Sequence, residues 1–353
     1  MTRKKLDYII IGQGLAGSTL AIKLLKLNKQ ILVIDEPDDN TSSRVAAGLF
    51  NPITGRKMVK TWLADKLFPA LHTHYREVEA LAGDSFFHSM PVYRPFISIE
   101  EQNEWMGKSP EPQFSAYVAS VTSTSTVNGV SDIYGGLTLT QCGYVDTVRY
   151  ISSVRKILDE KDMFLKHKVS DEDFEVVGEL TNFQDFEASK VVFCNGTHGN
   201  KWFGWLPVKP LKGEAVTVKS AIANNMIINR GVYVVPTRGK WRVGATYNYN
   251  DLVPGTTQNA RQELSERLQG LITESFEIEG QEWGLRPTTP DRRPMLGRHP
   301  GIKSFWIFNG LGTKGVSLAP YFAEVLIHSM ENGEPLNKEV DIERFKLLYW
   351  TSP

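Results

Sequence analysis

Residues 7–35 constrain the fold of this chain more than any other stretch. Asp7–Ile11 is a short apolar run typical of a buried parallel strand, and Gly12-Gln13-Gly14-Leu15-Ala16-Gly17 follows it in the pattern G-x-G-x-x-G. Apolar residues at helical spacing predict a helix over 18–26, and Ile31–Ile34 predicts a second strand. This order of strand, glycine turn, helix and strand is typical of the first βαβ unit of a Rossmann-like, dinucleotide-binding α/β domain.

Each glycine of the turn has a separate physical role. Gly12 permits a tight turn, Gly14 lets backbone N–H groups approach a pyrophosphate, and Gly17 lets the helix pack closely on the strand. Leu15 and Ala16, between the second and third glycines, are candidate cofactor contacts, and the helix after the turn has free N–H groups and a dipole that favour negative charge. The turn therefore predicts a phosphate-binding site.

An acidic residue ends the second strand. Asp35 lies 18 residues beyond Gly17, close to the roughly 20 expected for the carboxylate that binds an adenosine ribose, and Glu36 follows it. A free ribose hydroxyl favours NAD or FAD over NADP. The alternative is a βαβ unit whose tight turn binds no ligand.

Length and charge limit the remaining possibilities. A chain of 353 residues exceeds the size at which single cores stop growing, so two domains are expected. Acidic and basic residues are balanced at 40 each, which favours neither nucleic acid nor an anionic membrane as partner. A small-molecule substrate is expected, and a homo-oligomer is left open.

The N-terminus and the cysteines favour a cytoplasmic protein. The basic residues 3–5 and the apolar stretch after them imitate a signal peptide, but Asp7 and the glycine turn interrupt the pattern. No other run approaches the roughly 18 apolar residues needed to span a bilayer. We interpret Cys142 and Cys194 as reduced thiols, and no metal site is predicted.

The rest of the chain alternates between two kinds of pattern. Helical spacing over 61–82 and 144–158, and strands at 168–169, 174–177 and 190–194, extend the α/β domain. Short β-prone stretches within 86–139 and 205–246 indicate an antiparallel domain of the α+β type. We therefore predict a discontinuous FAD-binding domain over 1–85, 141–204 and 281–353, interleaved with a substrate-binding domain over 86–140 and 205–280.

Three further segments contain candidate ligand contacts. Ser43 or Arg44, in a stretch of small and hydroxyl residues, is available to a phosphate oxygen; the alternative is an ordinary surface loop in which Arg44 is solvated. Asn195-Gly196 follows a buried strand, where an open α/β sheet binds its ligand. Near the far end, the glycine-rich turn 310–315 follows the strand 305–308 and begins a second helix, which can stabilise negative charge on a cofactor ring. A flavin that is held by two distant segments requires the C-terminal part of the chain to come back to the N-terminal nucleotide-binding unit, whereas NAD does not.

These motifs together resemble the FAD-dependent amine and amino-acid oxidases of the D-amino-acid oxidase superfamily, especially the glycine oxidase and sarcosine oxidase branch. The resemblance covers nearly the whole chain and favours FAD over NAD. The turn Gly310-Leu311-Gly312-Thr313-Lys314-Gly315 and Ala319-Pro320 look more like the oxidase domain of the bifunctional bacterial tRNA 5-methylaminomethyl-uridine enzyme. The matching motifs are the glycine turn, 46–49, 210–214, 233–236, 243–246, 284–287 and the final glycine turn.

The resemblance implies a role for individual positions. Gly12, Gly14, Gly17 and Asp35 would hold the ADP half of FAD, and Val169 would contact adenine through its backbone. Arg44, Ala47, Gly48 and Gly196 would lie along the pyrophosphate and flavin, and Gly312, Thr313, Lys314 and Gly315 would face the flavin pyrimidine edge. Arg286 would bind a substrate carboxylate, Tyr233 would lie on the substrate side, and Lys314 would help to stabilise the charge of the reduced flavin.

The implied activity is oxidation of a primary or secondary amine by hydride transfer from the α-carbon to flavin N5, followed by imine hydrolysis. Members of this branch that bind flavin covalently use a cysteine close to the Arg-Pro motif. Here Thr288 and Thr289 follow Arg286-Pro287, so we expect FAD to be bound non-covalently. Arg242 falls near the position where sarcosine oxidases hold an oxygen-activating lysine, but the match is weak and a strand-surface arginine is the favoured interpretation. The choice between oxidase and dehydrogenase stays open. The alternatives are oxidation of carboxymethylaminomethyl-uridine in tRNA and a flavin-binding protein without catalysis.

Overall fold

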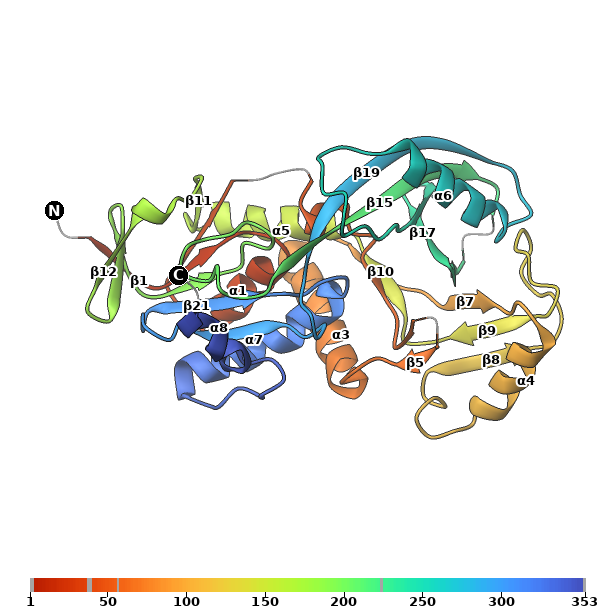
Figure 1. Cartoon of the computed structure of the whole chain (residues 1–353), viewed down its shortest axis with the longest axis horizontal. Helices are drawn as coiled ribbons and strands as arrows, with labels where there is room; N and C mark the ends of the chain where they lie inside the picture. Colours follow the sequence, from red (N-terminus) through yellow and green to blue (C-terminus); the bar gives the residue numbers. More distant parts are fainter. Residues whose placement is uncertain (1–2, 37–39, 56, 223–224, 352–353) are drawn as a thin grey trace.

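The computed structural model describes residues 3–36, 40–55, 57–222 and 225–351, which are organised around two large sheets (Figure 1). The first sheet has the strand order β11-β2-β1-β14-β13-β12, and β21 and β20 continue it from β14. Its strands are β1 Lys4–Ile11, β2 Ile31–Asp35, β11 Phe164–Lys166, β12 Phe174–Val177, β13 Leu180–Phe183, β14 Phe186–Phe193, β20 Met295–Arg298 and β21 Phe305–Asn309.

The central strands of this sheet are parallel and buried. β1 pairs in parallel with both β2 and β14, and β14 pairs in parallel with β21. The side chains of Tyr8, Ile9 and Ile10 are fully buried, as expected for strands covered on both faces. Four long helices of the described chain pack on one face of the sheet, where α7 contacts both α1 and α3, and residues 203–206 and Ile342 cover the other face. The four helices are α1 Leu15–Lys26, α3 Ala64–Ala82, α5 Thr147–Asp159 and α7 Gly315–Asn332.

The second sheet is antiparallel except for one pair. Its order is β19-β15-β18-β17-β16-β7-β9-β8, and only β16 and β7 run in parallel. Helix α6 (Gln258–Gln269) covers one face with Leu264 and Leu268 in a separate core cluster. The strands are β7 Val92–Pro95, β8 Val118–Thr122, β9 Gly136–Leu139, β15 Lys209–Ser220, β16 Ile227–Arg230, β17 Val232–Thr237, β18 Lys240–Gly244 and β19 Phe276–Thr288.

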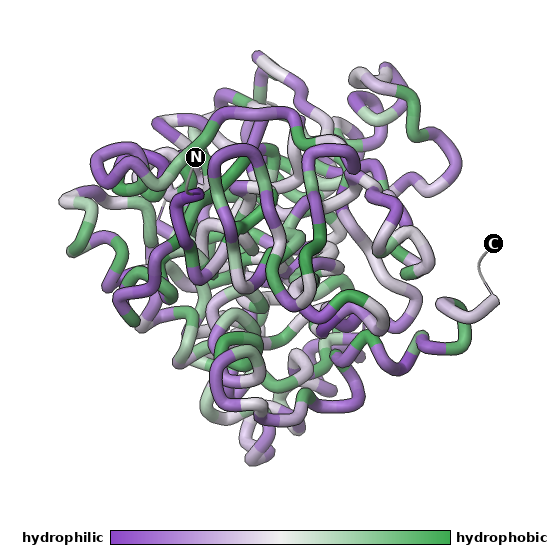
Figure 2. The backbone as a smooth tube through the Cα atoms, turned by 90° about the vertical axis from the view of Figure 1, so that its left-hand side faces the viewer, coloured by the Kyte–Doolittle hydropathy of each residue, from purple (hydrophilic) through white to green (hydrophobic). Residues whose placement is uncertain are grey.

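The remaining elements are short. Figure 1 shows the long strands β15 and β19 extending from the second sheet toward the helices of the first. Hydrophilic residues dominate the outer loops, and hydrophobic runs concentrate toward the interior (Figure 2). The short elements are α2 Ser42–Val45, β3 Leu49–Phe50, β4 Ile53–Thr54, β5 Val59–Lys60, β6 Phe87–Ser89, α4 Ile99–Lys108, β10 Gly143–Val145, α8 Lys346–Thr351 and the 3₁₀ turns Asp171–Asp173 and Ile342–Phe345.

The α/β fold class and the first βαβ unit are confirmed, and α1 begins at Leu15, three residues earlier than predicted. Two details of the sequence prediction are wrong. Residues 168–169 form no strand, because β11 ends at Lys166. The stretch 86–139 also contains helix α4, whose start has the Ser98–Glu101 spacing of a capping box, and Ser98 Oγ accepts the Glu101 N–H at 3.3 Å.

Two further expectations concern the cysteines and the membrane. Cys142 and Cys194 are free and buried, and burial raises the pKa of both thiols. Neither cysteine forms a disulfide. Within the described residues, no helix combines the length and hydrophobicity that crossing a bilayer requires.

Candidate active site

A large cleft lies between the two sheets and has a volume of about 1920 Å³. One wall comes from the start of α1, residues 42–55 and residues 309–318, and the other from β7 and β15–β19. It contains many of the predicted site residues: Gly14, Leu15, Ala16, Ser43, Ala47, Gly48, Gly196, Tyr233, Arg286, Gly312, Thr313, Lys314 and Gly315. The chain therefore brings both glycine turns and the candidate substrate residues to one cavity.

The glycines of the first turn differ in position. Gly14 lines the cleft, whereas Gly12 and Gly17 lie behind it against each other. A Cβ on Gly17 would lie 1.9 Å from the carbonyl oxygen of Gly12, so only glycine allows this contact between α1 and the turn. Gly12 itself has φ +98°, in the region that favours glycine. The close packing of turn and helix exposes the α1 N-terminus to the cleft.

Ser43 contacts this helix N-terminus directly. Its Oγ accepts the N–H of Leu15 at 3.1 Å and lies 2.8 Å from where a Gly14 Cβ would stand. The hydroxyl hydrogen is left to donate to an anion. Nearby, Gly48 has φ +69°, and a Cβ there would meet the Val145 carbonyl oxygen at 1.8 Å. Glycine at position 48 therefore allows residues 47–48, which line the cleft, to pack against β10.

Asp35 lies at the end of β2, behind the glycine turn rather than in the cleft lining. Burial raises the pKa of its carboxyl, against the opposing effects of Gln13 and Arg155. Its oxygen is 3.7 Å from Arg155, whose Nε also donates to Gln13 Oε1 at 2.7 Å. Asp35 is therefore held in place beside the turn, and the exposed Glu36 follows it.

Of the other predicted cofactor residues, some line the cleft and some lie outside its lining. Gly196 lines the cleft and accepts a hydrogen bond at 2.8 Å from Asn309 Nδ2, which joins the ends of β14 and β21. Asn195 instead donates its side-chain amide to the His198 carbonyl. Arg44 in α2 and Val169 after β11 are half-buried and outside the cleft lining.

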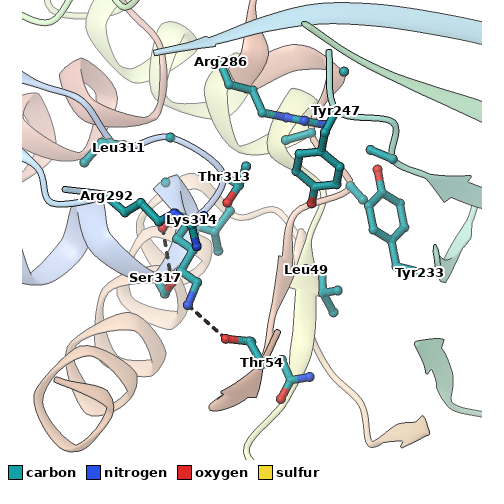
Figure 3. Close-up of a pocket in the computed structure, with 18 of the residues that line it drawn as sticks. Leu49, Thr54, Tyr233, Tyr247, Arg286, Arg292, Leu311, Thr313, Lys314 and Ser317 are labelled. Carbon is teal, nitrogen blue, oxygen red and sulfur yellow. Dashed lines mark hydrogen bonds between the residues drawn. The ribbon is translucent and has the colours of Figure 1, made fainter. Parts of the chain in front are cut away.

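The final glycine turn forms the base of the cleft. Gly312 has φ +55°, and its N–H donates to the Pro287 carbonyl at 2.9 Å, which ties the turn to β19. Lys314 precedes helix α7 and donates to Thr54 Oγ1 at 3.0 Å and to Thr61 Oγ1 at 3.3 Å (Figure 3). Burial, and to a smaller extent Arg293 and Arg292, lowers the pKa of Lys314 to about 8.

Arg286 and Tyr233 come together on the opposite wall. Arg286 donates to the Thr246 carbonyl at 3.3 Å, and its guanidinium lies 5.1 Å from the centre of the Tyr247 ring (Figure 3). Among the residues that the structure describes, no carboxylate forms an ion pair with Arg286. Burial raises the pKa of the Tyr233 phenol, although Arg242 and Arg286 oppose the shift. An uncompensated guanidinium faces the cleft beside two tyrosines.

Sequence reasoning missed several residues of this cleft. Tyr247, Thr54, Thr61 and Asn229 all line it, and no motif distinguished them from ordinary loop and strand residues. Arg242 is absent from the lining and pairs with Glu282 instead. The charge of the cleft also escaped prediction: eight of its described lining residues are lysine or arginine, and three are glutamate. A chain with no net charge thus has a basic cleft.

The two glycine turns and the parallel sheet, with the cleft between that sheet and the antiparallel one, define the class of dinucleotide-binding oxidoreductases. The bare backbone at Gly14 and Gly48, the α1 N-terminus and the basic lining fit the pyrophosphate and rings of FAD. The chain belongs to the family described as FAD dependent oxidoreductase (DAO), whose model matches residues 7–329. FAD is the cofactor of this family, and the predictions of an oxidoreductase and of FAD are confirmed.

Relatives with known activities are distant. The chain is 22% identical over 357 residues to the glycine oxidase of Pseudomonas aeruginosa, covering 93% of this chain and 95% of the relative. It is 25% identical over 343 residues to the bifunctional protein ThiO/ThiG of Synechocystis sp., covering 91% and 51%. It is 22% identical over 399 residues to the tRNA 5-methylaminomethyl-2-thiouridine biosynthesis bifunctional protein MnmC of Legionella pneumophila, covering 100% and 57%. The chain spans about half the length of these two bifunctional relatives.

Solved structures show the same fold. Glycine oxidase from Bacillus cereus superposes with a TM-score of 0.74 at 18% identity, covering 94% of this chain and 96% of that structure. Iminodiacetate oxidase from Chelativorans sp. gives a TM-score of 0.75 at 18% identity, covering 96% and 98%. The predicted fold, which interleaves a Rossmann-like domain with an antiparallel sheet, is therefore confirmed.

Proposed function

We propose that this chain oxidises a primary or secondary amine, in particular an amino acid, with FAD bound non-covalently. The observation that carries the proposal is Arg286, a half-buried guanidinium that faces the cleft with no carboxylate partner among the described residues. A planar guanidinium binds a carboxylate through two parallel hydrogen bonds. The small-molecule substrates named for glycine oxidase and iminodiacetate oxidase are amines with carboxylates, which supports this choice.

Residues of both sheets would hold the cofactor and the substrate. In this proposal, segments 1–85, 141–204 and 281–353 bind FAD through the α1 N-terminus, Ser43, Gly48 and the turn at 312–315. Segments 86–140 and 205–280 provide the substrate wall. When bound, FAD would supply the acceptor for the hydride lost from the α-carbon of the amine, and addition of water to the resulting iminium would release an amine and a carbonyl product.

The chain's own residues would act by position and charge. Arg286 would bind the substrate carboxylate, and Tyr233 and Tyr247 would limit how the α-carbon is oriented in the cleft. An amine that binds in its neutral form needs no side-chain base, because loss of a hydride converts it directly to an iminium ion. Lys314, at the start of α7, would contribute positive charge where negative charge develops.

Anaerobic spectroscopy of the purified flavoprotein tests this proposal. Glycine, sarcosine, proline and a set of D- and L-amino acids are added in turn, and bleaching of the flavin band identifies a substrate. Re-admission of air then distinguishes an oxidase from a dehydrogenase. We expect Arg286→Leu to raise KM for the carboxylated substrate by about 100-fold, whereas Arg76→Leu, on the exposed side of α3 and outside the cleft lining, leaves it unchanged. An unchanged KM in Arg286→Leu would contradict the anchoring role.

The second candidate substrate is a carboxymethylaminomethyl group on a tRNA uridine. The match to MnmC across the chain and the basic cleft favour it. Phosphate binding depends steeply on salt, so a tRNA gel shift that is lost between low and moderate salt would support this candidate. Flavin bleached by free amino acids, together with no tRNA shift at low salt, would eliminate it.

A further inference from the structure

Polar side chains lie side by side on three neighbouring strands of the second sheet, β7, β16 and β17. Asn229 on β16 pairs with Tyr233 on β17, and Tyr233 pairs with Gly244 on β18. Because Ile228 pairs in parallel with Tyr93, the next residues along these strands, Asn229 and Arg94, stand side by side. Arg94, Asn229 and Tyr233 all line the cleft. Strands lie about 4.8 Å apart, so the strand of Arg94 is about 10 Å from that of Tyr233.

Arg94 is incompletely paired. Glu101 lies 3.6 Å from it, but both oxygens of Glu101 already accept from Arg230 at 2.7 Å, and one also accepts the Ile97 N–H. The Nε of Arg94 is buried without a hydrogen-bond partner among the described residues. Burial, followed by the neighbouring Arg230, lowers the pKa of Arg94 to about 10, although Glu101 opposes the shift. One carboxylate therefore serves two guanidinium groups.

The amide of Asn229 is also open to a ligand. It is half-buried and takes part in no side-chain hydrogen bond within the described residues. An amide beside an under-compensated guanidinium offers several donors to one anionic group. Gly231 adjoins them in the lining and leaves the wall free of a side chain there.

We infer that Arg94 and Asn229 form a subsite for a second carboxylate of the substrate. The inference depends on the proposed function, in which the first carboxylate binds at Arg286 and the reacting carbon lies near Tyr233. The substrate would then be an amine with two carboxylates, the second separated from the reacting carbon by several carbon–carbon bonds. Mono-carboxylated amino acids would occupy only the Arg286 end of the cleft.

Binding of unreactive acids to the holoprotein tests the subsite without turnover. Glutarate, pimelate and azelate are compared with monocarboxylates of the same chain length, and the change in the flavin absorption spectrum is titrated. We expect the longer dicarboxylates to bind at least about tenfold more tightly than their monocarboxylate counterparts. Arg94→Met should abolish this preference and leave monocarboxylate binding unchanged. Equal affinities in the wild type, or a preference that survives in Arg94→Met, would overturn the inference.

Further variants separate this inference from the proposed function. Arg286→Leu should weaken both kinds of acid; if it weakens neither while Arg94→Met still removes the preference, the anchoring role of Arg286 fails and the subsite stands. If Arg94→Met does not fold, Asn229→Asp provides the test. The carboxylate introduced at position 229 would repel the carboxylate of the ligand and would form an ion pair with Arg94. A tRNA that displaces pimelate at low salt, and whose binding Arg94→Met weakens, would assign the subsite to phosphate and overturn the dicarboxylate inference.

Discussion

The guanidinium of Arg286 lies across the backbone of Gly213 on the neighbouring strand. A Cβ on Gly213 would stand 2.2 Å from Nη2 of Arg286 and 2.3 Å from Nη1. Gly213 is paired with Gly284, two residues before Arg286. The absence of a side chain on β15 therefore allows the arginine to lie flat against the sheet and to reach Tyr247 and the cleft.

Gly213→Ala should displace Arg286 without unfolding the protein. The atoms that the new methyl group meets are the flexible end of a side chain, so the arginine moves rather than the strand. We expect KM for the substrate to rise by about tenfold or more, with little change in Tm. Gly280→Ala, on the same strand pair with its nearest contact at 3.8 Å, is the control. Additive effects in the double variant Gly213→Ala/Arg286→Leu would contradict the mechanism.

Lys314→Met should change both stability and pH dependence. The pKa of Lys314 is lowered to about 8 in the folded protein, so the unfolded chain binds more protons above that pH. Burial of the charged lysine therefore destabilises the folded protein, and this destabilisation has its full size below about pH 8. It decreases as the pH rises from 8 toward 10.5, where the lysine also loses its proton in the unfolded chain. We expect Lys314→Met to have a higher Tm than the wild type at pH 7, with a difference that shrinks at pH 10.

The same titration predicts a pH profile. As the pH rises through about 8, Lys314 loses its charge, and kcat/KM should fall if that charge supports the reaction. Lys314→Met should be slower at pH 7 and should lack this limb of the profile. The exposed Lys338→Met should keep the wild-type profile. A limb that persists in Lys314→Met would show that another group titrates.

Gly17→Ala should disrupt the first glycine turn. The new methyl group would overlap the Gly12 carbonyl oxygen, a backbone atom that cannot rotate away. We expect a loss of about 1–3 kcal/mol of stability, or more, together with loss of bound FAD. Gly107→Ala is the matched control, since nothing lies within 4 Å of its Cβ position in helix α4. Thermal unfolding and the flavin content of the purified protein provide the measurements.

Asp35→Asn tests the ribose contact. Exchange of the carboxylate for an amide removes a charged acceptor at the end of β2, and we expect FAD to bind about 10- to 100-fold more weakly. Titration of the apoprotein with FAD, followed by flavin fluorescence, measures the change. The exposed Asp185→Asn should bind FAD like the wild type. Equal affinity in Asp35→Asn would assign Asp35 a purely structural role beside Arg155.

Local patterns in the sequence determined the parts of this protein that depend on neighbouring residues. The glycine turn, the helix after it and Asp35 are predictable because a βαβ unit places them within one short segment. The N-cap of α5 is similarly local, and Asp146 accepts the Arg149 N–H there at 3.0 Å. Helix α4 could have been predicted from its capping box, but the surrounding β-prone stretches obscured that signal.

The tertiary structure alone decided which distant residues meet in the cleft. Arg94, Asn229 and Tyr233 lie on three different strands, and their alignment depends on the register between those strands, which no local pattern specifies. Charge behaves in the same way: the chain as a whole is neutral, but folding gathers basic residues in one cavity. The lowered pKa of Lys314 has the same origin, because burial and the approach of Arg292 and Arg293 exist only in the folded chain.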